Sequence, residues 1–116
     1  ASASSTEAAS FSAAGNTDIT PGADSARHSV LATVSAGAGS YTRTVSLLTA
    51  NASEGDRVVI RFAMPASTNP TVQVRNATSG GTLLTTITGE ASGIPVCAEY
   101  TYDGSAWIET GAYYVE

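Results

Sequence analysis

Residues 57–64 read RVVIRFAM, and this stretch decides the fold class. Its residues alternate in polarity: one set is Val58, Ile60 and Phe62, and the other is Arg57, Val59 and Arg61. A period of two places successive side chains on opposite faces of a strand, and β-branched and aromatic residues favour strands over helices. The stretch therefore predicts a half-buried β-strand whose apolar face packs on a core.

Shorter runs with the same alternation lie on both sides of this strand. They span residues 29–36, 41–48, 71–75, 82–88 and 96–102, and a last strand begins at Trp107. Turn-forming residues separate them, including NATSGG at 76–81 and Asp103-Gly104, because Gly, Asn and Asp tolerate the backbone angles of tight turns. Seven or eight short strands with frequent turns predict an all-β domain over residues 28–116, either an antiparallel β-sandwich or a jelly roll.

Two finer expectations concern the later strands. Leu83 and Ile87 share one face if the alternation continues through residues 82–88, and Gly111 marks a bulge in the last strand. Cys97 has no neighbouring base or cation in the sequence, so we interpret it as a small packing residue rather than a nucleophile.

Residues 1–27 differ from the rest of the chain because they are almost all small and polar. A segment with so few large apolar side chains cannot bury enough surface to offset its loss of conformational entropy. Ser4 and Glu7 have the spacing of a helix-capping box, and Gly15 would end such a helix. We therefore expect an extended N-terminal arm over residues 1–27, either a disordered tail or a short helix, that becomes ordered against the β domain or a neighbouring subunit.

Composition limits the class of partner. The 116 residues carry five basic groups, all arginine, and ten acidic groups, for a formal net charge of -5. Phosphate binding requires clustered cations, so nucleic acid is not an expected partner. No apolar run approaches the length of a bilayer span and the N-terminus lacks the features of a secretory signal, so neither a membrane nor an export route is expected. Cys97 is the only cysteine, which excludes an intrachain disulfide.

The sequence offers no constellation typical of an enzyme or a metal centre. His28 is the only histidine and no GxSxG turn is present, so we interpret it as a polar junction residue rather than a catalytic base. One histidine and one distant cysteine do not make a zinc site. Calcium would need convergence of the carboxylates in expected loops, which are Asp18, Asp24, Glu54, Asp56 and Asp103. We expect these carboxylates to be solvated, and no cofactor is expected.

Two carbohydrate-directed alternatives stay open. Glu99 and Glu109 lie on adjacent expected strands, where paired carboxylates could serve glycoside hydrolysis, although surface acids are the simpler interpretation. Sugar binding uses exposed aromatic platforms, for which the candidates are Tyr41, Tyr100, Tyr102, Trp107, Tyr113 and Tyr114. Trp107 and alternate tyrosines more often pack inside a sheet.

The order of three motifs resembles β domains of bacteriophage virion proteins. The strand EGDRVVIRF, the hairpin NATSGGTLL and the closing turn YDGSAW occur in that order between residues 54 and 109. The resemblance implies a non-enzymatic structural part of a virion, with no family catalytic residues to carry over. Within that class, a β body with an N-terminal arm is similar to small capsid decoration, or cement, proteins.

This resemblance implies a location on the capsid surface of the virion after synthesis in the host cytoplasm. The expected partners are the major capsid protein and neighbouring copies of the chain, in a homo-oligomer such as a trimer. The arm would order on the shell by burying apolar side chains while its backbone pairs with exposed strand edges. We expect Phe11, Ile19 and Arg27 to be the contact residues. The alternative is a tail- or fibre-associated module that binds carbohydrate or a receptor.

Overall fold

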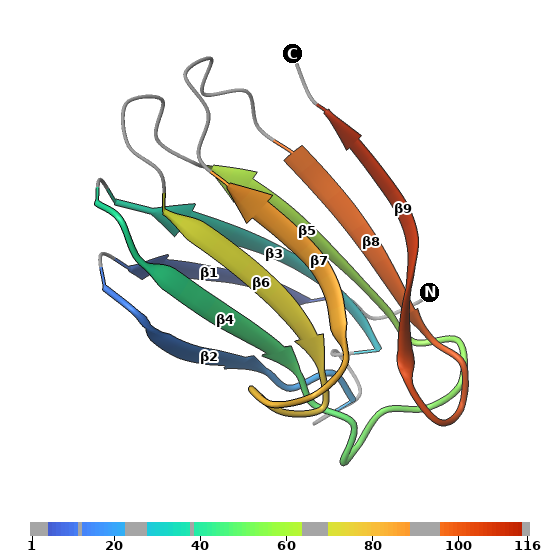
Figure 1. Cartoon of the computed structure of the whole chain (residues 1–116). Helices are drawn as coiled ribbons and strands as arrows, with labels where there is room; N and C mark the ends of the chain where they lie inside the picture. The colour runs from blue at the N-terminus through green and yellow to red at the C-terminus, as the bar shows by residue number, and fades with distance from the viewer. Residues whose placement is uncertain are drawn as a thin grey trace.

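Two facing β-sheets make up the part of the chain that the computed structural model describes, which is residues 5–11, 13–22, 28–37, 39–63, 70–88 and 96–114 (Figure 1). Its nine strands are β1 (Ser5–Phe11), β2 (Gly15–Ile19), β3 (Ser29–Ala36), β4 (Thr42–Leu47), β5 (Arg57–Ala63), β6 (Thr71–Asn76), β7 (Leu83–Thr88), β8 (Val96–Tyr102) and β9 (Trp107–Tyr114). One sheet has the order β1-β3-β5-β8-β9 and the other β2-β4-β6-β7. The described ranges contain no helix, and so none that is long and apolar enough to cross a membrane. The all-β, sandwich-like expectation is confirmed.

The first six strands alternate between the two sheets. β1, β3 and β5 lie parallel to one another in the five-stranded sheet, and β2, β4 and β6 lie parallel in the four-stranded sheet. Each successive pair, β1–β2, β3–β4 and β5–β6, forms one layer of a stack, and we call these layers rungs 1, 2 and 3. The expectation of purely antiparallel sheets is wrong for these strands, because the chain visits the opposite sheet before it returns. A jelly roll is not confirmed.

The last three strands follow the expected antiparallel pattern. β7 turns back on β6, β8 pairs with β5, and β9 turns back on β8. Residues 28–116 thus contribute seven described strands, β3 to β9, to a fold whose other two come from the N-terminal segment.

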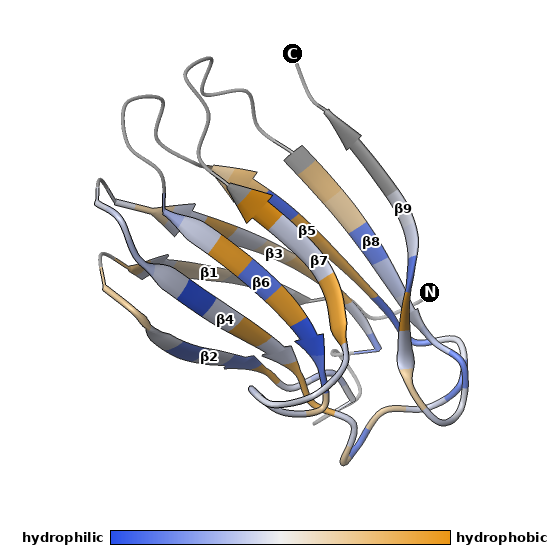
Figure 2. Ribbon diagram, in the orientation of Figure 1, coloured by the Kyte–Doolittle hydropathy of each residue, from blue (hydrophilic) through white to orange (hydrophobic). Residues whose placement is uncertain are grey.

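The core lies between the sheets and is built from inward rows. Val58, Ile60 and Phe62 are fully buried, as the alternation in β5 predicts. The strand register continues each row across the sheet, so that one row runs from Phe62 through Val34 to Ala9. In the four-stranded sheet the matching row is Val74, Val45 and Thr17. Figure 2 shows the alternation of apolar and hydrophilic residues along β6.

Two aromatic side chains join the sheets. Trp107 is 1% exposed, and its indole Nε1 donates a hydrogen bond of 3.1 Å to the backbone carbonyl of Leu48. Tyr100 is fully buried, and its hydroxyl donates to Thr85 Oγ1 at 2.6 Å, from the five-stranded to the four-stranded sheet. Burial raises the pKa of Tyr100, the bond to Thr85 acts in the opposite direction, and the negative charge of Glu109 adds to the rise.

Turn chemistry at the end of β8 matches the expectation for Asp103-Gly104. Asp103 Oδ1 accepts hydrogen bonds from the backbone N–H groups of Ser105 and Ala106, both at 2.8 Å. These donors hold the pKa of the Asp103 carboxyl below its usual value. Gly104 has φ of 101°, a left-handed conformation that favours glycine. The tight reversal lets β9 pair directly with β8.

Two bulges interrupt the ladders. In β9, Gly111 pairs with Glu99 and Glu109 pairs with Tyr100, so Thr110 is an extra residue next to the glycine that was expected to mark a bulge.

In β7, the pairing shifts between Val74 and Arg75 and leaves Leu84 as the extra residue. Leu84 and Ile87 pack on the core, whereas Leu83 is 44% exposed. The expectation that Leu83 shares the face of Ile87 is therefore wrong, because a bulge resets the alternation.

The structure does not confirm the N-terminal arm. Residues 5–11 form β1, which pairs with β3, and residues 15–19 form β2, which pairs with β4. The helix suggested by Glu7 and Gly15 is wrong, since Glu7 lies in the middle of β1. Ser4 lies outside the described residues. The segment forms strands because it pairs with strands that are already buried, and this long-range pairing overrides its local sequence preference.

Candidate functional site

One side of the molecule ends in two edge strands that belong to the same rung. β1 is the edge of the five-stranded sheet and β2 is the edge of the four-stranded sheet (Figure 1). We call this pair of strands the N-terminal edge. An edge strand presents a row of backbone N–H and C=O groups that can pair with another chain. At the opposite side, β7 and β9 pack against each other across the sheets.

A cleft of about 230 Å³ opens between the two sheets at the N-terminal edge. Its lining includes Ala9 of β1, Thr17 and Ile19 of β2, and Val34 of β3. The cleft lies where one inward row becomes smaller toward this edge, since Ala9 follows Phe62 and Val34. We call this space the edge cleft.

Phe11 and Ile19, two of the three expected contact residues, lie in the core instead of standing free. Phe11 is 9% exposed and its ring packs edge-to-face on Tyr41, with centroids 6.4 Å apart. Ile19 is 4% exposed and pairs in register with the fully buried Leu47. Arg27, the third expected contact residue, lies outside the described residues. Rung 1 is therefore anchored to the body by its two largest apolar side chains.

Arg43 fastens the start of β2, a role that the sequence analysis did not assign. Its Nε and Nη2 donate to Thr17 Oγ1 at 3.2 and 2.9 Å, and Nη2 also donates to the carbonyl of Asn16 at 3.1 Å. The guanidinium lies 5.0 Å from the centroid of the Phe11 ring, within the range of a cation–π contact. The sequence could have indicated this role, because the alternation over residues 41–48 places Arg43 on the same face as the apolar residues Val45 and Leu47.

The outer side of β2 carries a short polar network. Ser46 Oγ donates to Asn16 Oδ1 at 2.6 Å, and Asn16 Nδ2 donates to Asp18 Oδ1 at 2.6 Å. Asp18 is exposed and contributes to the lining of the edge cleft.

His28 and Asp56 form a pair at the start of rungs 2 and 3. His28 Nδ1 lies 2.9 Å from Asp56 Oδ1, and the other carboxylate oxygen accepts from Ser53 N–H at 2.8 Å. Asp56 is 5% exposed. The pair links residues just before β3 and β5, and the backbone N–H of Arg57 donates to the carbonyl of His28. This geometry matches the interpretation of His28 as a polar junction residue.

The carboxylates considered as calcium ligands do not converge within the described residues, where no three His, Cys, Asp or Glu side chains are grouped as a metal site would require. The expectation that these carboxylates are solvated is wrong for Asp56, which is buried and bonded to His28, whereas Asp103 is exposed and accepts bonds from its own turn. Asp24 lies outside the described residues. Cys97 is buried and forms no disulfide.

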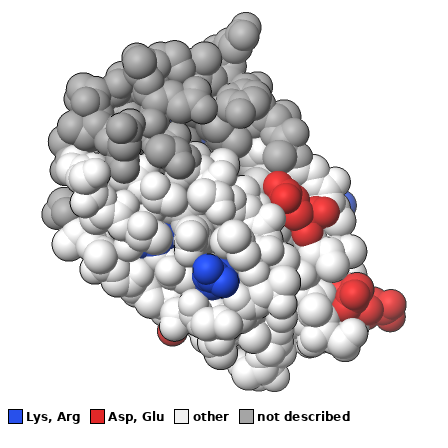
Figure 3. Space-filling model, in the orientation of Figure 1, with Lys and Arg blue, Asp and Glu red and all other residues white. Residues whose placement is uncertain are grey.

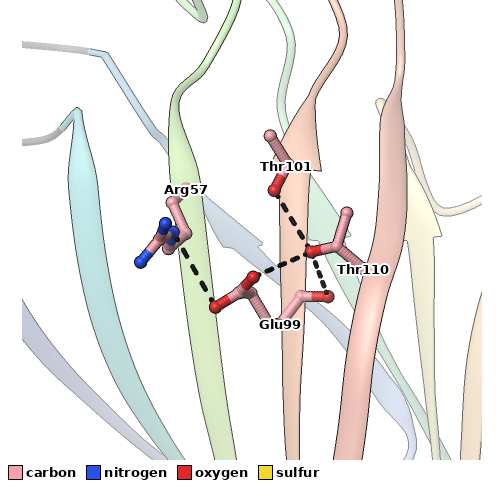
Figure 4. A network of polar contacts seen from close by, with 4 residues as sticks. All are labelled: Arg57, Glu99, Thr101 and Thr110. Atoms are coloured by element: carbon pink, nitrogen blue, oxygen red, sulfur yellow. Dashed lines mark hydrogen bonds and ion pairs between the residues drawn. The ribbon is translucent and has the colours of Figure 1, made fainter.

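Glu99 belongs to a polar network on the outer face of the five-stranded sheet (Figure 4). Thr110 Oγ1 donates to Glu99 Oε1 at 3.0 Å and lies 3.1 Å from Thr101 Oγ1, while Arg57 Nε is 3.8 Å from Glu99 Oε2. Glu109 pairs directly with the inward-facing Tyr100, so its side chain is on the opposite face from that of Glu99. The paired-carboxylate alternative is therefore wrong, because the two acids do not face one cleft.

Three of the six aromatic candidates for a sugar platform are internal. Trp107, Tyr100 and Tyr102 are 1%, 0% and 8% exposed, and none of them offers a ring face to a ligand. The hydroxyl of the partly exposed Tyr41 donates to the carbonyls of Gly37 and Phe11. The side chains of Tyr113 and Tyr114 lie outside the described parts of the chain.

In the view of Figure 3 the described charged groups are scattered and form no basic cluster.

Comparison of the chain with protein-family models, with curated proteins and with solved structures gave no match. The geometry of the N-terminal edge is thus the main structural guide to function.

Proposed function

We propose that the protein is a non-enzymatic structural component of a bacteriophage virion, a capsid decoration protein that attaches to the shell through its N-terminal edge. The observation that supports the proposal is the edge cleft between β1 and β2, which lies beside an edge strand available for pairing. The order of the strand, hairpin and turn motifs between residues 54 and 109, which is similar to that of virion β domains, points to the same class.

Attachment in this proposal uses a formed surface rather than an arm that orders on binding. Phe11 and Ile19 hold rung 1 on the body, so the backbone of β1 is already extended before a partner arrives. A preformed edge avoids most of the entropy loss that a disordered tail would suffer. The partners are the major capsid protein and, around each attachment point, neighbouring copies of the chain. Many such contacts repeated by the symmetry of the shell would stiffen it.

Co-sedimentation with purified capsids of the encoding phage tests this function. The informative variant is Ala8→Pro, which removes a backbone donor from the edge strand, and the matched control is Thr110→Ala on the outer face of the five-stranded sheet. We expect the wild-type chain and Thr110→Ala to sediment with capsids and Ala8→Pro to stay in the supernatant. Failure of the wild-type chain to bind, or binding of Ala8→Pro equal to wild type, would refute attachment through this edge.

A further inference from the structure

Rung 1 is joined to the rest of the fold on one side only. β1 is an end strand that pairs with β3, and β2 is an end strand that pairs with β4. The strands of rungs 2 and 3 each have a paired strand on both sides. Among the described strands, rung 1 can therefore leave as a unit with the loss of two strand pairings, and the remaining stack keeps its own pairings.

Rung 1 also contributes less to the core than the rungs behind it. Among the described residues, its buried apolar side chains are Phe11 and Ile19, one from each strand. Rung 3 buries Val58, Ile60, Phe62, Val72 and Val74. The edge cleft lies along the junction, since its walls come from rung 1 and rung 2. A terminal unit with few buried contacts opens at a lower free energy than the whole domain, so rung 1 is the part of the fold that opens first.

The chain that leads from rung 1 to rung 2 passes through a tight point at Gly22. Its φ of 78° lies in the left-handed region, and a Cβ at this position would collide with the backbone carbonyl oxygen of Asn51, in the loop after β4. The preceding residue, Pro21, is fully buried. A close turn is thus needed to place rung 1 on its own body, and tight connections of this kind favour exchange of an element between identical chains.

The contacts that hold rung 1 determine what else can occupy its place. An open chain would present the free edges of β3 and β4, with the sites of Phe11 and Ile19 between them. It would also present Arg43, whose guanidinium donates to Thr17 Oγ1 and to the carbonyl of Asn16. The same guanidinium lies 5.0 Å from the centroid of the Phe11 ring. Rung 1 meets all of these contacts in register, and a second copy carries the identical segment.

We propose that two copies of the chain exchange rung 1, so that β1 and β2 of each copy pair with β3 and β4 of the other, with Gly22 as the hinge. The contacts within each body are the same in the closed and exchanged forms, so the balance depends on the hinge and on protein concentration. Each body still carries a complete rung 1, and the N-terminal edge is unchanged. The inference goes beyond the proposed function and applies to the free chain in solution.

An engineered disulfide tests the exchange directly. Ala8 and Thr33 are register partners in β1 and β3. Neighbouring strands lie about 4.8 Å apart, within the Cα separation of about 4.4–6.8 Å that a disulfide spans. Ala8→Cys with Thr33→Cys, in a Cys97→Ala background, therefore links rung 1 to the body that carries it. A closed chain forms this bond within itself, whereas an exchanged pair appears as a covalent dimer on a denaturing gel without reductant.

A substitution at the hinge, made in this cysteine variant, should shift the balance toward exchange. Gly22→Ala disfavours the close turn of the closed form, and we expect the ratio of covalent dimer to monomer at equal concentration to rise about tenfold. The matched control is Gly81→Ala, whose Cβ also meets a backbone carbonyl oxygen, that of Asn76. Gly81 lies between β6 and β7, outside the connection to rung 1, so this control should lower Tm and leave the ratio unchanged.

Each variant is refolded from urea at a series of protein concentrations before oxidation, so that both forms are accessible. We expect the covalent dimer to increase with concentration and to keep the far-UV circular dichroism of the monomer. The proposal is overturned if the disulfide stays within one chain at every concentration, or if Gly22→Ala and Gly81→Ala change the ratio equally. A dimer in sedimentation whose disulfides are all intrachain would also overturn it, since the copies would then associate without exchange. If Gly22→Ala fails to fold, the cysteine pair without a hinge substitution still decides between the two forms.

Discussion

Replacement of Ile19 by alanine distinguishes an N-terminal segment that packs in the core of the isolated chain from one that becomes ordered only when it binds a partner. Ile19 is 4% exposed, lies at the end of β2 and pairs in register with Leu47. If it were only a contact residue of an arm, the substitution would leave the stability of the isolated chain unchanged. Because it is part of the core, we expect the free energy of unfolding to fall in the absence of any partner.

The magnitude follows from the atoms removed and from their position. Ile19→Ala deletes three carbon atoms, and at about 0.8 kcal/mol for each buried methylene the transfer contribution is about 2.4 kcal/mol. Substitutions of this kind usually cost about 2–5 kcal/mol, the upper part of which reflects an empty cavity. Ile19 also lines the edge cleft, which is open to solvent, so the additional cavity cost is small. We expect a loss of about 2–3 kcal/mol and, at about 4 °C per kcal/mol, a fall in Tm of about 8–12 °C.

Urea unfolding at 25 °C measures this change. The fluorescence of Trp107, the only tryptophan and 1% exposed, reports on the core, and far-UV circular dichroism reports on the sheets. The matched control is Thr6→Ala, an exposed residue of the same rung, for which we expect a change within about 0.5 kcal/mol. Equal unfolding midpoints for Ile19→Ala and the wild-type chain would show that rung 1 is not part of the cooperative unit and would refute the reasoning.

Three further substitutions probe the polar and tight contacts. Tyr100→Phe removes the hydrogen bond to Thr85 and should cost about 1–2 kcal/mol at pH 7 by chemical denaturation. Burial favours the neutral form of Tyr100 and raises its pKa above the unfolded value of about 10. The contribution of this group to the free energy of unfolding is therefore complete below about pH 10 and falls by about 1.4 kcal/mol per pH unit above it. In a urea series from pH 8 to 11, Tyr100→Phe should lack this part of the loss of stability. Asp56→Ala leaves a loop amide and the histidine without their acceptor, and we expect a loss of about 1–3 kcal/mol in thermal unfolding, whereas no change would contradict the junction role. Gly81→Ala places a Cβ 1.7 Å from the carbonyl oxygen of Asn76, so it should lower Tm more than Gly80→Ala, which meets no atom within 4 Å; equal Tm values would contradict the close approach.

The local signals of the sequence predicted the strands of residues 28–116 well. In residues 57–62, an apolar side chain at every second position was sufficient, because only one face of such a strand can be buried, and Val58, Ile60 and Phe62 are indeed fully buried. The turn at Asp103-Gly104 was readable for a similar reason, since few residues form that backbone geometry. The face on which Leu83 lies was predicted wrongly, because the position of a bulge depends on the partner strand as well as on the strand itself.

Parallel pairing and the place of residues 5–19 could not be read in the same way. A hairpin is signalled by the turn between its strands, but β1 and β3 pair across an intervening strand in the other sheet, so no local motif marks their contact. The strand STEAASF has small residues, and its Glu7 has a capping-box spacing with the preceding Ser4, which favours a helix or a tail when the segment is considered alone. Arg43 gave a usable signal, because a cation on an apolar face needs acceptors nearby, and β2 provides them.

The same property of rung 1 explains both the failed prediction and the candidate site. Small side chains such as Ala9 and Thr17 gave β1 and β2 a weak strand signal, and in the folded chain they leave the edge cleft between the sheets. Terminal units of stacked β structures normally need a polar or bulky cap to close the core. Rung 1 has its two large anchors, Phe11 and Ile19, at the ends of its strands. A partner strand would complete the stack, so the residues least able to fold alone are those that the proposal assigns to assembly.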